Sequence, residues 1–571
     1  MRPQLLFCGV TTAALVAGGA VNSTDLKRAV NVPTAVWRWT GGYIGGHVGG
    51  GYGQTSFSDP YGKSLYGDVV QTPVFLAGGQ IGYNWQNERW VFGVELDASR
   101  AASDGTNTCL AASSSVISAN CSAGPSVFAT GTGRLGYAFG PHGQTLVYLK
   151  GGLAWQNNSG VVANNNEFAE DSTYRSGRAP QNSTRFAYGR VGGTIGVGVE
   201  QALTNAWSLS LEYDYLKFNG PSVATPPTLQ YPPFATVPAN TTGLSSSYHI
   251  GKLGLNYHFD ALPQAPEPDT PLYAKKPTVS ASPSGLAGGW SLEGGTRLWL
   301  SRGRFQWDVG STDLISRLTY HGLDGISGEL FERLDSPWGI FLKGNIGFGR
   351  FNDGKINNED WGVDPLAYQN HLSGQGNGRF TYYTADAGYD VLRGSTYKAG
   401  GFMGWSYYGQ KSDSIGCVQT VSSKAPCLAP GDRRIIGSQD TDWNALRVGI
   451  SAETTLLDRW RINADIAYLP WTDFRGRDNH LLRHSTTFDD QRGSGGGGGV
   501  QLEAALSYSI TKNVSVGIGG RYWAMWTPNQ RKLLQTTAEA ENSYPVTYGP
   551  SSSNYRMERW GTFFQASYKF D

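Results

Sequence analysis

The 571-residue sequence contains no run of about 18 apolar residues beyond its N-terminal segment, so no membrane-spanning helix is predicted. It also lacks an excess of either charge, because 46 Lys and Arg residues are balanced by 45 Asp and Glu residues. Nucleic-acid binding depends largely on cationic contacts with phosphates, and a near-neutral chain gives no indication of it. We therefore expect no nucleic-acid partner.

The mean hydropathy of −0.34 resembles that of a soluble protein. A transmembrane β-barrel also has a low mean hydropathy, because only every second residue of each strand faces lipid. The chain contains 78 glycines, and 12% of its residues are aromatic. Abundant glycine, tyrosine and tryptophan, together with short alternating segments, favour a barrel over a cytosolic enzyme.

Cysteine is scarce, with five residues in the whole chain. Cys8 lies in the N-terminal segment, and the other four form two pairs that are close in sequence, Cys109 with Cys121 and Cys417 with Cys427. Each pair lies in a polar stretch, which in an oxidising compartment predicts two local disulfides. No histidines cluster near either pair, so we expect no metal site.

The N-terminal segment 1–22 has the features of a secretory signal peptide. One basic residue precedes an apolar core of about 12–15 residues, and small residues follow around Ala20, where cleavage is expected. The segment is too short to span a membrane as a helix. It indicates export to the cell envelope.

Apolar and polar residues alternate through residues 37–259. In WSLSLEYDY, residues 207–215, the apolar and aromatic residues occupy odd positions and the polar residues even positions. About eight such segments occur, each near the 9–11 residues that a tilted strand needs to cross a bilayer.

A soluble β-sandwich also alternates, but aromatic and charged residues favour a membrane barrel here. Aromatic residues stand at strand ends, as an interfacial girdle requires: they are Tyr43, Trp85, Trp90, Trp155, Trp207, Tyr215 and Tyr257. The polar face carries both charges: Glu95, Asp97, Glu200, Glu212 and Asp214 against Arg134, Lys150 and Lys252. An eight-stranded barrel is too narrow for a channel, so these groups are predicted to pair inside it as a filled interior.

Residues 260–286 are rich in proline and do not alternate, which predicts a semi-rigid linker. An even number of strands returns the chain to its starting side, so the linker is expected in the periplasm. Residues 287–571 alternate again, over about ten segments. The predicted fold is all-β, with two tandem transmembrane antiparallel β-barrels of about eight and about ten strands.

Several motifs of residues 37–259 resemble one known family. They are, in order, WTGGYIGGHVGGGYG, GGQIGYNWQ, GTGRLGYAFG, LVYLKGGLAW and KLGLNYHF. The region resembles the eight-stranded outer-membrane immunogenic or porin-like proteins of alphaproteobacteria. The resemblance implies an envelope role and surface antigenicity, with no known chemistry.

Residues 287–571 contain DLISRLTYHGLDGISGELF, GKINNEDW, YKAGGFMGWSYYGQK and RINADIAYLPWTDFRGRDNH. This region resembles the omptins, ten-stranded outer-membrane proteases. The resemblance implies that Asp478 and His480 form an Asp-x-His pair, in which the carboxylate orients a neutral imidazole that acts as a base on water. It also implies that Asp360 is one of two acids on the opposite side of the site.

The second acid of that side is missing, because Asn358 stands at its position. A neutral amide can bond to water but provides no negative charge. Glu359 lies beside it, and on a strand its side chain points to the opposite face, so it could substitute only if the segment bends. The acids that give omptins their basic specificity fall at Gly476 and near Leu298, so cleavage beside Arg or Lys is not expected.

Three functions remain open. The favoured hypothesis is a Gram-negative outer-membrane protein with a structural, surface-antigen first barrel and a catalytically degenerate omptin-like second barrel. The alternatives are an active omptin-type endopeptidase with altered, non-basic specificity, and a small-solute pore. Expected partners are outer-membrane lipid and lipopolysaccharide, the barrel-assembly machinery and, for a protease, a peptide or protein substrate. No cofactor is expected, although lipopolysaccharide would be needed by an active omptin; the long loops are expected outside the cell.

Overall fold

The computed structural model describes most of the chain from residue 37 onward. The described residues are 37–61, 69–112, 117–140, 142–164, 182–230, 235–259, 289–309, 314, 316–360, 369–421, 428, 431–456, 459–482, 488–494, 497–527, 530–532 and 551–570. Their regular structure is entirely β, in 24 strands. No helix among them is long and apolar enough to span a bilayer.

The first sheet, as far as it is described, closes into a ring of eight long antiparallel strands because β12 pairs with β1. The ring strands are β1 (Gly41–Phe57), β3 (Val74–Asn87), β4 (Trp90–Ser103), β6 (Ile117–Phe139), β7 (Thr145–Asn164), β8 (Ser183–Ala202), β9 (Trp207–Thr225) and β12 (Asn240–His258). The short strands are β2 (Val69–Gln71) on β1, β5 (Thr106–Ala112) on β6, and the pair β10 (Thr228–Gln230) and β11 (Ala235–Val237).

The second sheet, within the same described ranges, closes into a ring of ten long antiparallel strands through the pairing of β13 with β24. The ring strands are β13 (Ser291–Val309), β14 (Ser316–Asp335), β15 (Ile340–Asp360), β16 (Gln369–Arg393), β17 (Tyr397–Val421), β18 (Ile435–Leu456), β19 (Trp460–His480), β21 (Gly498–Ser509), β22 (Val514–Trp526) and β24 (Ser551–Phe570). The short strands are β20 (Phe488–Ser494) on β19 and β23 (Gln530–Lys532) on β24.

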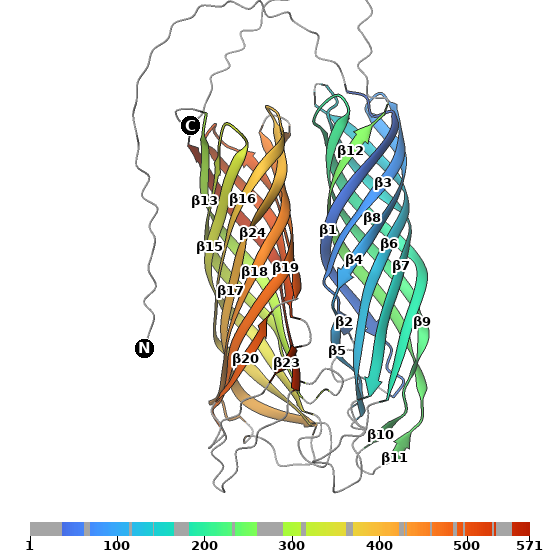
Figure 1. Ribbon diagram of the computed structural model, residues 1–571, viewed down its shortest axis with the longest axis vertical. Coiled ribbons are helices and arrows are strands. Elements are labelled where there is room, and N and C mark those ends of the chain that lie inside the picture. Colours follow the sequence, from blue (N-terminus) through green and yellow to red (C-terminus); the bar gives the residue numbers. More distant parts are fainter. Residues whose placement is uncertain are drawn as a thin grey trace, which may run out of the picture.

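The predicted all-β fold of two tandem barrels is confirmed. The two barrels stand side by side with their axes roughly parallel (Figure 1). We call the end that holds Gly41, His258, Ser291 and Phe570 the proximal end, and the end that holds Asp360 and His480 the distal end. The predicted signal peptide, 1–22, and the predicted linker, 260–286, lie outside the described residues.

The strands are longer than the predicted 9–11 residues: the ring strands contain 12 to 25 residues. The estimate counted only the part that crosses a bilayer. On β15 the exposed large apolar side chains run from Ile340 to Phe348, and the strand then continues to Asp360. Both barrels therefore extend well beyond their apolar belt at the distal end.

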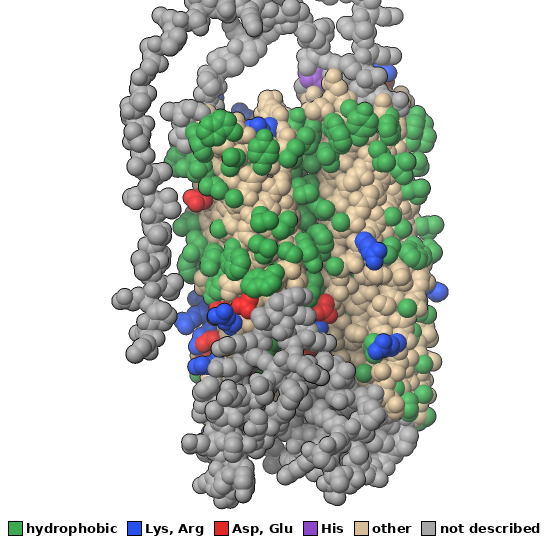
Figure 2. Space-filling model, viewed as in Figure 1, with side chains coloured by type: hydrophobic (Ala, Val, Ile, Leu, Met, Phe, Trp, Pro, Cys, Tyr) green, Lys and Arg blue, Asp and Glu red, His purple; other side chains and the backbone are tan. Residues whose placement is uncertain are grey.

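The outer surface of the barrels carries the apolar belt expected of lipid-facing strands. Large side chains such as Ile81, Leu96, Leu153 and Leu330 are more than half exposed. Hydrophobic side chains spread over the visible sides of both barrels, while most charged side chains seen on the second barrel lie toward its distal end (Figure 2). Exposed apolar rows of this extent are consistent with a bilayer around both barrels.

The interior of the first barrel is filled by ion pairs. Lys150 Nζ lies 2.7 Å from Glu212 and 3.3 Å from Glu95. Arg134 reaches Glu200 at 3.2 Å. The eight charged residues predicted to point inward are all buried: Glu95, Asp97, Arg134, Lys150, Glu200, Glu212, Asp214 and Lys252. The prediction of a filled interior is confirmed.

The second barrel is filled by a mixture of aromatic and charged side chains. Arg521 lies over the ring of Trp299 and pairs with Glu329 at 2.6 Å, while Tyr382 and Trp523 pack around it. Toward the proximal end there is a charged cavity of about 90 Å³. This volume holds a few water molecules.

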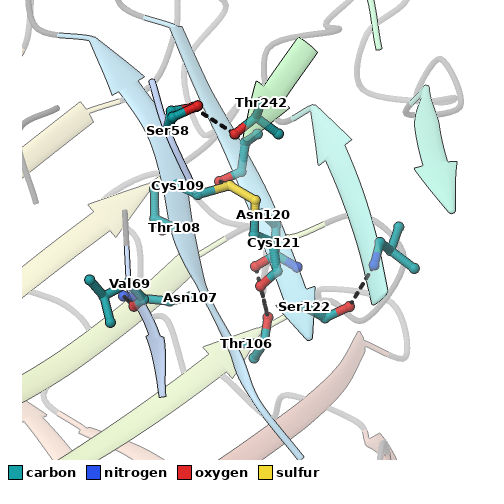
Figure 3. The surroundings of a disulfide bond; sticks show 12 residues. Ser58, Val69, Thr106, Asn107, Thr108, Cys109, Asn120, Cys121, Ser122 and Thr242 are labelled. Atoms are coloured by element: carbon teal, nitrogen blue, oxygen red, sulfur yellow. Dashed lines mark hydrogen bonds between the residues drawn. A yellow bond between two sulfur atoms is a disulfide. The ribbon is translucent and has the colours of Figure 1, made fainter. Parts of the chain in front are cut away.

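The structure contains a disulfide between Cys109 and Cys121, the first of the two expected pairs. It joins β5 to β6 at the distal end of the first barrel. Both cysteines are fully buried in an apolar cluster with Leu110 and Val162, and polar side chains of the same two strands lie nearby (Figure 3). Cys417 is also disulfide-bonded. Its expected partner, Cys427, lies outside the described residues.

The interior ion pairs predict a large effect of Lys150→Met. The substitution leaves the buried carboxylates of Glu95, Glu212 and Asp214 without a shared cation, and breaking a buried pair in this way costs about 3–5 kcal/mol. Urea unfolding of the detergent-refolded protein, followed by gel mobility, measures the loss. In the control, Lys411→Met, the more exposed pair with Asp440 is removed at a cost below about 1 kcal/mol. Equal losses of unfolding free energy in the two variants would contradict the conclusion that Lys150 belongs to a buried group of ion pairs.

Candidate functional site

Asp478 and His480 lie at the distal end of β19, on the face that points into the second barrel. They share this face with Phe474, which is fully buried in the aromatic core. His480 Nε2 lies 3.4 Å from Asp478 Oδ2. The carboxylate is therefore placed to orient the imidazole, as the Asp-x-His resemblance implied.

Asn358 and Asp360 lie at the distal end of β15, also facing inward. They alternate with Glu359 and share a face with Ile356, a member of the buried core. The Asn358 side-chain amide donates to Nε2 of His371, with 3.1 Å between the nitrogen atoms. Because that ring nitrogen accepts the hydrogen bond, the imidazole of His371 is neutral.

His371 is the site residue that sequence reasoning missed. It lies on β16, directly opposite Asn358 in the strand register. Burial lowers the pKa of His371, and the negative charge of Asp360 opposes that shift. No sequence motif marks this histidine, because only the register between β15 and β16 places it beside Asn358.

Tyr320 connects the two sides of the site. On β14 it pairs with Ile356, two residues before Asn358. Burial raises the pKa of Tyr320 well above its ordinary value, and the charge of Asp478 raises it further, while a hydrogen bond with Ser414 opposes the shift. The tyrosine therefore lies within electrostatic range of Asp478 and next to the strand that carries Asn358.

Glu359 does not enter the site. The strand β15 continues to Asp360 without a bend at this point, so the Glu359 side chain faces outward, away from the positions of Asn358 and Asp360. It is 1% exposed and accepts a hydrogen bond from Thr108 of the first barrel at 3.1 Å. Glu359 could replace the missing acid only if this segment bent, and the described strand places its side chain on the opposite face from Asn358 and Asp360.

The two positions that carry the specificity-determining acids in omptins lie on different faces of the second barrel's strands in this protein. Gly476 shares the inward face with Asp478 but has no side chain with which to line a pocket. Leu298 is 46% exposed on the outer surface, whereas its neighbours Arg297 and Trp299 are buried inside. The acidic position of the omptins aligns near Leu298, and a shift of one residue in that alignment moves the side chain to the other face of the strand.

A second group of reactive residue types lies at the proximal end of the first barrel. Ser208 Oγ is 2.8 Å from His258 Nε2, and the same nitrogen lies 3.3 Å from Glu200. A catalytic triad needs the serine and the acid on opposite ring nitrogens. Here one nitrogen faces both, and Ser208 and Glu200 are fully buried, so the group closes the barrel interior.

The described residues contain no cluster of three or more His, Cys, Asp or Glu side chains that could hold a metal ion. The described part of the distal site contains several acid–base groups. Asp478 and His480 provide an oriented imidazole, and Asp360 provides one carboxylate on the other side. Asn358 and His371 form a neutral pair in the place of a second carboxylate.

Similar proteins support the placement of the first barrel in the outer membrane. Residues 11–259 match the family of the outer membrane protein beta-barrel domain. The 31 kDa outer-membrane immunogenic proteins of Brucella melitensis biotype 1 and Brucella suis biovar 1 are each 28% identical over 257 residues. These alignments cover 43% of this chain and 94% of each relative.

The chain also aligns with several solved structures. The outer membrane protease OmpT from Escherichia coli aligns with a TM-score of 0.41 and 14% identity, over 51% of this chain and 100% of that chain. A Pseudomonas aeruginosa FadL homologue aligns with a TM-score of 0.20 and 11% identity, over 93% of this chain and 90% of that chain.

The chain is thus an outer-membrane β-barrel protein of Gram-negative bacteria. Its N-terminal half carries an outer-membrane β-barrel domain similar to the Brucella 31 kDa immunogenic proteins, and part of the chain is structurally similar to OmpT.

The neutral state of His371 predicts a dependence of stability on pH. Below about pH 6.5, the ordinary histidine pKa, the unfolded chain binds a proton that folded His371 binds less readily, so acid favours unfolding. His371→Gln removes this contribution while keeping an acceptor for Asn358. Urea midpoints at pH 8 and pH 5 should fall less in the variant than in the wild type. Equal decreases of the urea midpoint in the variant and the wild type would show that protonation of His371 does not contribute to the loss of stability in acid.

Proposed function

We propose that the protein is a surface-exposed structural and antigenic component of the outer membrane, with a hydrolytic site in its second barrel that is degenerate. The observation that carries the proposal is the neutral pair of Asn358 and His371. A hydrolytic site of this kind needs negative charge on that side to hold and polarise the attacking water. One carboxylate, Asp360, is left there.

Two further features support loss of activity. Glu359, the acid that follows Asn358 directly in sequence, is bonded to the first barrel instead of facing the site. Gly476 leaves the pocket next to Asp478 without a side chain that could select a substrate. In each case the site lacks a side chain that would help to position a peptide substrate.

An active endopeptidase is the second candidate, and the contact between Asp478 and His480 favours it. In that case His480 acts as the base on water, Asp478 orients it, and Asp360 with Asn358 holds the water. A small-solute pore has less support, because ion pairs and packed aromatic rings occupy the described interiors of both barrels.

We also propose that the distal end faces the outside of the cell. In both rings an even number of strands returns the chain to the proximal end, where the segment between the two barrels also begins and ends. The Brucella relatives are named immunogenic proteins, which fits exposure of the distal loops to antibodies.

Activity is tested by refolding the protein in detergent with lipopolysaccharide and screening a peptide library. The wild type is expected to give no cleavage. Asn358→Asp restores an acid beside Asp360, and we expect cleavage at least about 100-fold above background, which is lost again in Asn358→Asp/His480→Ala. Cleavage by the wild type that disappears in His480→Ala would establish the endopeptidase instead.

Orientation is tested with an epitope tag inserted between β15 and β16, at the distal end. Antibody should label intact cells that carry this tag. A matched tag between β12 and β13, at the proximal end, should be labelled only after the outer membrane is permeabilised. The reverse pattern would overturn the proposed orientation.

A further inference from the structure

The outer surface of the second barrel changes from apolar to polar along β13. Leu298 and Leu300 face outward and are each 46% exposed. Further along the same face, Arg304, Gln306 and Asp308 also point outward, yet none is more than 9% exposed. A polar surface beyond the membrane would ordinarily be open to water, so something covers these three side chains.

The cover is the first barrel. Arg304 donates to the side-chain oxygens of Gln71 at 3.0 Å and Asn107 at 3.2 Å. Gln306 donates to the carbonyl oxygen of Thr106 at 3.4 Å. These contacts join β13 to the short strands β2 and β5, which lie on the side of the first barrel nearest the second (Figure 1).

An ion pair reinforces the contact from β24. Arg556 Nη2 lies 3.1 Å from a carboxylate oxygen of Asp104, and its Nη1 lies 3.1 Å from Asp308. The guanidinium thus joins a carboxylate of each barrel. Asp104 lies two residues before the start of β5, so the ion pair belongs to the same patch as the contacts with Asn107 and Thr106.

A chain of hydrogen bonds extends the patch to β15. Arg317 donates to Thr108 Oγ1 at 2.9 Å and to Asn120 Oδ1 at 2.7 Å. Thr108 in turn donates to Glu359 at 3.1 Å. Arg317 and Glu359 are 0% and 1% exposed, so both charges are taken fully out of water at this contact.

Nearly all the partner groups of the first barrel come from two paired segments, residues 104–112 and 117–122. The Cys109–Cys121 disulfide joins these two segments, and Thr106, Asn107, Thr108 and Asn120 surround it (Figure 3). The crosslink holds the two strands together while their polar side chains meet the second barrel. We call residues 104–112 and 117–122 the docking hairpin.

The two barrels also pack against each other within the apolar belt. Leu253 of the first barrel and Ile466 of the second point outward but are only 4% and 5% exposed, and they share one core cluster with Ala452 and Ala464. The rings of Phe75 and Tyr468 lie 4.8 Å apart across the same contact. The apolar packing buries surface but does not fix the orientation of one barrel relative to the other. The distal ion pairs and hydrogen bonds do fix it, because they form only in one arrangement.

We propose that the docking hairpin binds the outer surface of β13, β14, β15 and β24 and holds the two barrels together as one rigid unit in the outer membrane. The buried charges on that surface require this partner, because a charge removed from water is tolerated only when it is paired and hydrogen-bonded. The hairpin also holds Glu359 outward, which keeps Asn358 and Asp360 facing the interior. The inference does not depend on whether the distal site is active.

The test separates docking from simple tethering. A recognition sequence for a specific protease is inserted between β12 and β13, and the full chain is folded in detergent before it is cut. An affinity tag on the second barrel then captures it. The first barrel of the wild type should remain bound after cleavage, while gel mobility shows that both halves are folded.

Three variants identify the contact that is responsible. Asp104→Arg places a cation against Arg556, and Thr108→Val removes the hydroxyl between Arg317 and Glu359; each should raise the apparent dissociation constant of the cut halves at least tenfold. Asp104→Glu should bind close to the wild type, because it keeps a carboxylate opposite Arg556. The control, Asp440→Arg, changes a half-exposed pair with Lys411 and should bind like the wild type.

Separation of the folded wild-type halves on cleavage would overturn the proposal, since the two barrels would then be held together only by the linker. Wild-type affinity in both Asp104→Arg and Thr108→Val would overturn it as well, because the docking hairpin would contribute nothing. If Asp104→Arg fails to fold, Thr108→Val alone decides, since valine matches threonine in shape.

Discussion

In both barrels the last strand pairs with the first, β12 with β1 and β24 with β13, so the ring strands leave no open edge. Within hydrocarbon no water is present to bond an unpaired N–H or C=O group, and each such group costs several kcal/mol. Closure is therefore the condition under which these strands can stay in a membrane. It also divides the residues of every strand into an inward and an outward set.

That division gives charged residues of the same type two different roles. Inside the first barrel, Lys150 and Glu212 pair to fill a space too narrow for a channel. On the outside of the second barrel, Arg317 and Arg556 pair with carboxylates and with groups of the docking hairpin, so they join one barrel to the other. Burial alone does not distinguish these roles, since all four side chains are largely out of water.

The alternation between inward and outward residues has its clearest consequence at the distal end of β15. Three consecutive residues there belong to two different surfaces: Asn358 and Asp360 face the candidate site, and Glu359 faces the first barrel. The acid that lies nearest in sequence to the missing carboxylate is thus committed to contact between the barrels. A protein that uses this position for assembly cannot also use it to polarise water, which links the proposed loss of hydrolysis to the pairing of the two barrels.

The amino-acid sequence by itself determined the strands of both rings, the eight charges that fill the first barrel and the closeness of Cys109 to Cys121, because these are repeating or local patterns. It also placed Asp478 beside His480, since residues two apart on a strand share a face. Only the tertiary structure decided that His371 lies beside Asn358, that Leu298 faces outward, and that Thr108 bonds to Glu359, 251 residues away. These depend on the register between strands and on the docking of two rings, which arise from contacts between segments far apart in the chain and leave no periodic trace in the sequence.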